Sequence, residues 1–141
     1  LQKEIGMAVI LITHDLGVIA STCDRVLVMY AGKIVEKARS EELFAEPQHP
    51  YTEALMNSLP SRRVRGETLY TIPGAPPDLA TKFQECPFAP RCAYAVDQCR
   101  ETVPELVVTN ETRATACLRV QQGELERLDA QSTSAGEMAI E

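Results

Sequence analysis

An uninterrupted apolar run, Met-Ala-Val-Ile-Leu-Ile-Thr, occupies residues 7–13 and narrows the choice of fold more than any other segment. The run is short and rich in β-branched residues, which favours a strand over a helix. A strand without alternating polar residues is typical of a parallel sheet that helices cover on both faces. We therefore expect an α/β fold in which residues 7–13 form a buried strand.

The flanking segments predict the remainder of such a layer. Gly6 would end a helical turn, and Asp15 can cap a helix over residues 16–22. Residues 25–30 and 33–37 are predicted to pair as a hairpin through the tight turn Ala31-Gly32.

Shorter elements are expected further along the chain. Ser40 can cap a helix over residues 41–46, and His49 precedes Pro50 at the start of another helix. The Pro-rich residues 61–85 predict an extended arm. The tail at 121–141 is too polar to pack, apart from a helical stub at 124–128.

Composition excludes several classes of function. Acidic residues outnumber basic ones by 20 to 14, and the net charge is −6, which argues against binding to nucleic acid. No apolar run has the length that a membrane span requires. The chain opens on Leu1 in what looks like the last turn of a helix, so we expect further sequence before it; a processed small protein is the alternative.

Four of the five cysteines fall within one window, at Cys86, Cys92, Cys99 and Cys117. In a reducing compartment thiols stay free, which favours metal ligation over disulfides, although inert buried cysteines remain an alternative. The spacings lack the C-x-x-C pairs that structural zinc prefers and suit the wider corners of an iron–sulfur cubane. We expect three arginines to offset the charge of such a site: Arg91, Arg100 and Arg113.

His14 directly follows the predicted buried strand. Ligands of α/β sheets gather outside the carboxyl ends of the strands, so an imidazole here could bind a phosphate oxygen or orient a water molecule. A histidine that only satisfies loop carbonyls is the plainer interpretation.

The sequence around His14 resembles the switch region of ABC ATPases. The resemblance lies in Leu11-Ile12-Thr13-His14-Asp15-Leu16 and Val28-Met29-Tyr30-Ala31-Gly32-Lys33. The resemblance implies that His14 is the catalytic histidine that senses the γ-phosphate of ATP bound with Mg²⁺. The Gly-rich loop that would hold the phosphates is not present in these residues, nor are the signature segment and the acidic magnesium strand. We therefore expect ATP hydrolysis by the intact parent and not by this chain alone.

A second resemblance covers Glu46-Pro47-Gln48-His49-Pro50-Tyr51, Ile72-Pro73-Gly74-Ala75-Pro76-Pro77 and Cys86-Pro87-Phe88-Ala89-Pro90-Arg91-Cys92. These segments look like the C-terminal extension of oligopeptide and dipeptide importer ATPases. That resemblance implies a 4Fe-4S cluster on the four cysteines, because some members of this branch carry one. His49 and Tyr51 belong to the sequence motif shared with this family, and we expect them to fix the start of a helix.

Together the two resemblances imply an α/β fragment of a P-loop ATPase at 1–60, an irregular cysteine-rich extension at 61–120 and a tail at 121–141. The implied partners are membrane-spanning permease subunits, a second ATPase subunit and, indirectly, a peptide-binding protein. The implied location is the cytoplasmic face of the cell membrane. Two alternatives stay open at this point: a nickel importer subunit, and a free-standing metal-binding interaction protein.

Overall fold

A computed structural model describes residues 2–59, 70–80 and 82–126. The N-terminal half contains α1 (Gln2–Ile5), α2 (Leu16–Thr22), β1 (Arg25–Tyr30), β2 (Lys33–Arg39), α3 (Ser40–Ala45) and α4 (Pro50–Asn57). The C-terminal half contains the 3-10 helices η2 (Ala89–Arg91) and η3 (Asp97–Arg100), followed by β3 (Val107–Val108), β4 (Ala114–Thr115) and α5 (Leu118–Gln121). No helix among the described residues is long and apolar enough to cross a membrane.

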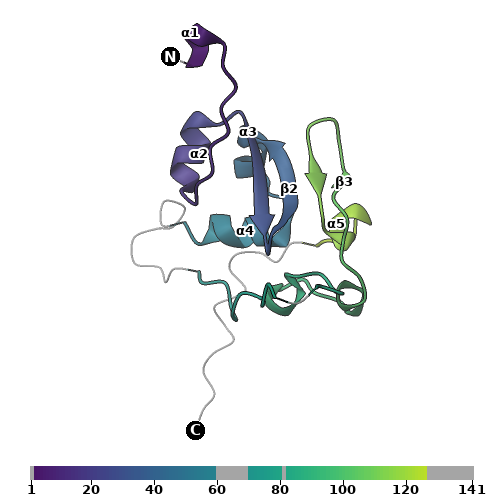
Figure 1. The fold of residues 1–141 in the computed structure, drawn as a ribbon. Coiled ribbons are helices and arrows are strands. Elements are labelled where there is room, and N and C mark those ends of the chain that lie inside the picture. Colours follow the sequence, from purple (N-terminus) through teal and green to yellow (C-terminus); the bar gives the residue numbers. More distant parts are fainter. Residues whose placement is uncertain (1, 60–69, 81, 127–141) are drawn as a thin grey trace.

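One antiparallel sheet joins the two halves of the chain, in the strand order β1-β2-β4-β3 (Figure 1). The predicted hairpin is confirmed: β1 pairs with β2, and β2 continues to Arg39. Ala31 and Gly32 form its turn with φ of 50° and 76°, the left-handed values that a two-residue hairpin turn requires. The short strand β4 lies on the other side of β2, so residues that follow the cysteine loops complete the sheet.

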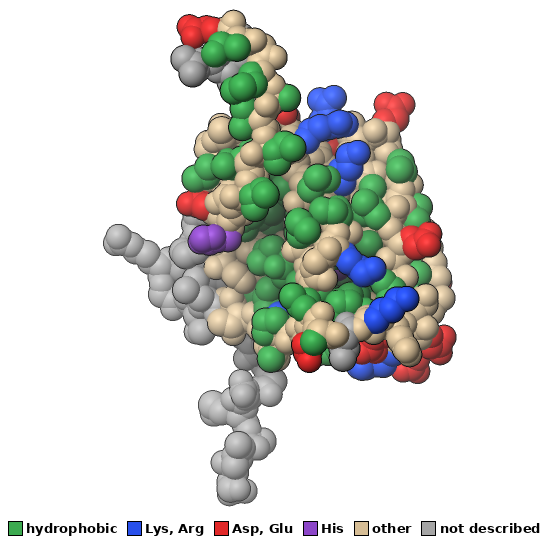
Figure 2. All heavy atoms as spheres, viewed as in Figure 1, with side chains coloured by type: hydrophobic (Ala, Val, Ile, Leu, Met, Phe, Trp, Pro, Cys, Tyr) green, Lys and Arg blue, Asp and Glu red, His purple; other side chains and the backbone are tan. Residues whose placement is uncertain are grey.

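The predicted strand at 7–13 is not formed, which corrects the sequence-based expectation. These residues pair with no strand in the described part of the chain, and the side chains of Ile10 and Ile12 are 93% and 94% exposed. Figure 2 shows the apolar side chains that project along this N-terminal segment and on the sheet face beside it. A strand that is apolar on both faces needs paired strands and covering layers, and the described residues supply neither.

Two of the expected helix starts are confirmed and one is wrong. Asp15 Oδ1 accepts hydrogen bonds from the backbone N–H groups of Gly17 and Val18 at 2.9 and 3.1 Å, and so caps α2. His49 Nδ1 accepts from the Tyr51 N–H at 3.0 Å at the start of α4. Ser40 does not cap α3, because α3 already includes it and Arg39 occupies the capping position.

The remaining segments are largely irregular. Residues 70–80 and 82–85 form neither helix nor strand, as expected of an extended arm. Residues 124–126 are not helical, and the rest of the predicted stub lies outside the described residues, as does most of the predicted tail. The boundaries of the predicted domains stay a prediction.

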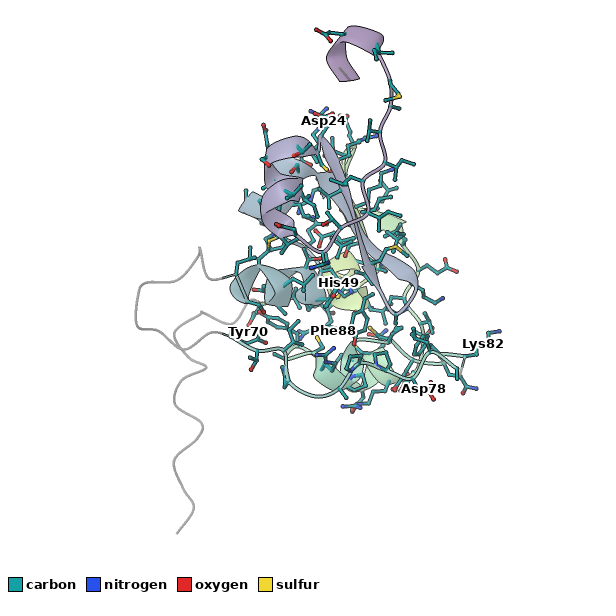
Figure 3. All side chains as sticks on the ribbon, turned by 60° about the vertical axis from the view of Figure 1, so that its left-hand side comes forward. Asp24, His49, Tyr70, Asp78, Lys82 and Phe88 are labelled. Atoms are coloured by element: carbon teal, nitrogen blue, oxygen red, sulfur yellow. The ribbon has the colours of Figure 1, made fainter. Side chains whose placement is uncertain are left out.

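The core lies between the inward face of β1 and the helices α3 and α4. It contains Val26 and Val28 of β1, Leu43 of α3 and Met56 of α4, all with at most 8% exposure. Phe88 joins this core from the cysteine-rich part, and its ring lies 5.2 Å from Tyr30 and 5.4 Å from Tyr51. Aromatic packing therefore fixes the loop that carries the first two cysteines against the hairpin (Figure 3).

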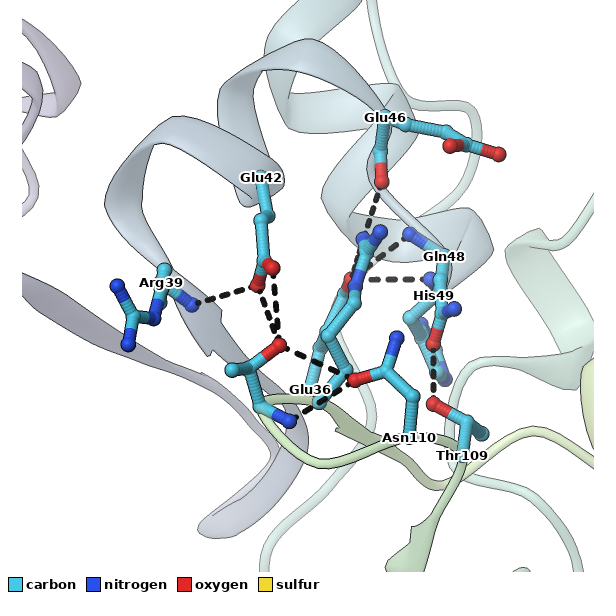
Figure 4. A network of polar contacts seen from close by, with 10 residues as sticks. Glu36, Arg39, Glu42, Glu46, Gln48, His49, Thr109 and Asn110 are labelled. Atoms are coloured by element: carbon cyan, nitrogen blue, oxygen red, sulfur yellow. Dashed lines mark hydrogen bonds and ion pairs between the residues drawn. The ribbon is translucent and has the colours of Figure 1, made fainter.

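A buried carboxylate also fastens the two halves together. Glu36 of β2 is fully buried, and its two oxygens accept from the backbone N–H groups of Gln48 at 2.7 Å and His49 at 2.9 Å (Figure 4). Arg113, from the C-terminal half, lies 3.4 Å from the same carboxylate and also donates to the Glu46 carbonyl. Glu36 of β2 thus contacts two other segments of the chain, the start of α4 and the C-terminal half.

We expect Glu36→Ala to lower the free energy of unfolding by about 3–5 kcal/mol, because it leaves Arg113 buried without its counter-charge. Urea denaturation followed by far-UV circular dichroism would measure the loss. Glu46→Ala is the matched control, since the Glu46 side chain is exposed, and it should change stability by less than about 0.5 kcal/mol. An equal effect of the two substitutions would contradict the role given to Glu36.

His49 makes the stability of the fold depend on pH. Burial lowers its pKa from 6.5 to about 4, partly opposed by a hydrogen bond to the Ala116 backbone. Between these two pH values the unfolded chain binds a proton at this ring and the folded chain does not, so stability falls as the pH drops from 6.5 to 4 and this contribution levels off below that. The shift corresponds to about 3 kcal/mol.

Denaturation curves at a series of pH values would test this effect. We expect His49→Asn, which keeps a capping side chain, to remove this part of the pH dependence. The chain has only two histidines, so His14→Asn, at an exposed position, is the control and should leave the profile as it is. A steep fall that persists without His49 would show that other groups cause it.

Candidate functional site: a cavity lined by four cysteines

The four clustered cysteines line one small cavity of about 20 Å³ in the C-terminal half. Among the other lining residues are His49, Phe88, Tyr94 and Arg119. The fifth cysteine, Cys23, follows α2 and is not part of this wall. All five are free cysteines. The structure therefore brings together the whole cysteine set that the sequence singled out.

Three local structures position these thiols. Cys86 and Cys92 flank the turn at η2, and Phe88 between them inserts into the core. Cys99 lies in η3, and its carbonyl accepts a hydrogen bond of 2.9 Å from the Cys86 N–H, which ties the second turn to the first. Cys117 follows β4, and the Ala116 N–H donates to the Val35 carbonyl at 2.8 Å, so the hairpin sets the place of the last thiol.

The electrostatics of the cavity favour protonated thiols as long as it holds no cation. Burial raises the pKa of Cys86, Cys92 and Cys117, that of Cys92 to about 12, and repulsion from the other cysteines raises them further. Backbone N–H groups act the other way: those of Phe88 and Ala89 lower the pKa of Cys86, and that of Tyr94 lowers the pKa of Cys92. These sulfurs thus lie near other cysteines and also near backbone hydrogen-bond donors.

This wall does not have the geometry of a site for a single ion. Across residues 2–59, 70–80 and 82–126, no group of three or more histidine, cysteine or acidic side chains could hold a metal ion. His49 borders the cavity, but its Nδ1 accepts from the Tyr51 N–H and its ring N–H donates to the Ala116 backbone. Both ring nitrogens are therefore occupied, and the cysteines alone are left as soft donors.

The arginines near the site differ from those we expected. Arg113 pairs with Glu36, and Arg91 donates to the carbonyls of Pro73 and Ile72 and to the Tyr30 hydroxyl. Arg100 is exposed on η3. None of the three lines the cavity, whereas Arg119 does. Sequence reasoning missed Arg119, although its place two residues after Cys117 was a usable signal.

His14 is separate from the cysteine cavity. It lies in a bend directly before α2, it is exposed, and it is not one of the residues that line the cavity. The hydroxyl oxygen of Thr13 accepts from the Asp15 N–H at 3.0 Å, and Asp15 in turn caps α2. These bonds fix the backbone on both sides of His14 and leave its ring open to solvent.

Comparison with known proteins places this geometry in a family context. Residues 35–99 match the family model for the C-terminal region of oligopeptide/dipeptide transporters. A probable peptide ABC transporter ATP-binding protein of Sinorhizobium fredii is 52% identical over 120 residues, which is 84% of this chain and 36% of that protein.

The oligopeptide transport ATP-binding proteins of Haemophilus influenzae and Escherichia coli are each 44% identical, over 117 and 119 residues. These alignments cover 83% and 84% of this chain but only 36% and 35% of the two relatives, so the chain spans about a third of their length. The names of the relatives support neither the nickel-import alternative nor the free-standing metal protein. The matched segment contains Glu36, His49 and three of the four cavity cysteines, and the chain belongs to the family of oligopeptide/dipeptide ABC transporter ATP-binding proteins.

Proposed function

We propose that this chain forms the C-terminal part of the ATP-binding subunit of an ABC importer for short peptides. The observation that supports this proposal is the match of residues 35–99 to the transporter C-terminal region, together with relatives named for peptide transport. In a polypeptide of the relatives' full length, ATP and Mg²⁺ would bind to segments outside this chain. The subunit would act with a second ATPase subunit and with permease subunits at the cytoplasmic face of the membrane.

In this proposal His14 is the residue of the chain that reaches the nucleotide. Its ring is exposed, while Thr13 and Asp15 hold the backbone on either side of it. A neutral imidazole in such a place can accept a proton from an attacking water molecule or donate a hydrogen bond to a phosphate oxygen. The apolar segment 7–13 would then be the strand that presents His14, once neighbouring strands cover it.

The 141-residue chain alone should bind no nucleotide, because it contains no Gly-rich phosphate loop. Isothermal calorimetry with ATP and Mg²⁺ should give no saturable heat. A micromolar dissociation constant would contradict the proposal that nucleotide binding depends on segments outside these residues.

We propose further that Cys86, Cys92, Cys99 and Cys117 hold a 4Fe-4S cluster. Support comes from the shared cavity, from backbone N–H groups directed at the sulfurs, and from a donor set of thiols without a free histidine. A cubane takes one thiolate on each iron, so its ligands stand farther apart than those of a single ion. The cluster would supply a rigid cross-link between three loop segments that have little regular structure of their own.

Anaerobic reconstitution with ferrous iron and sulfide tests this site. We expect a brown protein with broad visible absorption and about four irons per chain. Cys92→Ser should lose most of the iron and should unfold more readily, because bound metal supplies folding free energy to so small a unit. The matched control is Cys23→Ser, which removes a cysteine outside the cavity and should keep the full iron content. A colourless protein with one zinc per chain would refute the cluster.

A further inference from the structure

Arg119 is held at the cavity wall by two backbone carbonyls. Its Nη1 donates to the Tyr94 carbonyl at 3.2 Å, and its Nη2 donates to the Glu124 carbonyl at 2.6 Å. Tyr94 itself lines the cavity, so one arm of the guanidinium is fixed directly to the cysteine loop. The planar fork of an arginine is well suited to such a clamp, because its two Nη atoms can be anchored while the N–H of the third nitrogen, Nε, keeps a fixed direction.

The third nitrogen of this guanidinium, Nε, has no hydrogen-bond partner. Arg119 Nε is shielded from water and makes no hydrogen bond in the structure. Buried donors are nearly always satisfied, and each exception needs an explanation such as a missing ion or ligand. No described carboxylate forms an ion pair with Arg119, in contrast to Arg113 with Glu36. Within the described part of the chain, this cation therefore has a spare donor and no carboxylate partner.

The described residues that line the cavity with Arg119 include no aspartate or glutamate, so the four cysteines are the candidate anions there. Sulfur atoms that bind a metal carry negative charge and accept hydrogen bonds from N–H donors. Four thiolates around an iron–sulfur core leave a net negative charge, which a fixed cation stabilises most when water is excluded. The other arginines near the site are engaged elsewhere or exposed.

We infer that Arg119 is the positioning cation of the cysteine site, and that its Nε–H donates to a sulfur of the anionic cluster that the four thiolates hold. This inference rests on the proposed iron–sulfur site. Arg119 ligates no iron in this arrangement; it compensates the charge of the cluster and favours the form with one more electron. Electrostatic tuning of this kind acts on the reduction potential, which a purely structural clamp would leave unchanged.

The midpoint potential of the reconstituted protein is the decisive measurement, taken by anaerobic dithionite titration. Arg119→Gln should lower the equilibrium constant for one-electron reduction about tenfold, which shifts the midpoint by about 59 mV in the negative direction. Arg119→Lys keeps the positive charge but lacks the planar guanidinium, so it should shift the midpoint potential less than Arg119→Gln does. Arg100→Gln is the matched control: it removes the same charge next to Cys99 from an exposed position and should leave the potential nearly unchanged.

Each outcome decides the question. Full iron content with an unchanged potential in Arg119→Gln overturns the inference, and so does a shift of equal size in Arg100→Gln. If Arg119→Gln takes up no iron, circular dichroism of the metal-free variants decides: a wild-type spectrum shows that the cation is needed for loading, whereas lost structure shows a clamp only and overturns the inference. A wild-type chain that takes up no iron refutes the proposed cluster itself, before any variant is compared.

Discussion

The burial of Glu36 is the constraint on which the arrangement of this chain depends. A carboxylate without water contact must have its charge and its lone pairs satisfied, and here two backbone N–H groups at the start of α4 and the guanidinium of Arg113 do so. These partners come from segments far apart in the sequence. Because the partners must converge on one strand of the hairpin, the helix α4 and the C-terminal strands are fixed relative to the N-terminal half. His49 itself lines the cysteine cavity, and so does Cys117, which follows the C-terminal strand β4.

The sequence predicted the elements whose cause is local. Asp15 and His49 cap their helices through side-chain bonds to residues two or three positions ahead, and Ala31-Gly32 closes the hairpin through its own backbone angles. Residues 7–13 show where local reasoning ends. Their apolar, β-branched composition predicts a strand, but a strand exists only when another strand accepts its hydrogen bonds, and the described residues offer none to this segment. Composition indicates that a segment favours a strand, but it does not indicate whether the fold provides a partner strand.

The cysteine site shows the same division. Clustering in the sequence predicted that Cys86, Cys92, Cys99 and Cys117 act together as metal ligands. In the structure the four line one cavity, and their role as ligands stays a prediction. The arginines could not be assigned in this way. Arg91 and Arg113 are closer in sequence to the predicted ligands than to their actual partners, the carbonyl of Pro73 and the carboxylate of Glu36. A long flexible side chain chooses its partner through tertiary contacts, so its role follows from the fold and not from its spacing.

Sheet pairing links the cysteine cavity mechanically to the hairpin. β4 adds to the free edge of β2 with Glu36 opposite Thr115, and Cys117 lies only two residues beyond that pair. Phe88, between the first two cysteines, packs against Tyr30 at the end of β1. A displacement of the hairpin would therefore move two of the cavity's walls at once, and a rigid group bound by the four sulfurs would resist it. If the cysteines hold a cluster, its structural effect is to stiffen the attachment of the C-terminal half to the strand that carries Glu36, which is the same attachment that the buried carboxylate maintains from the other side.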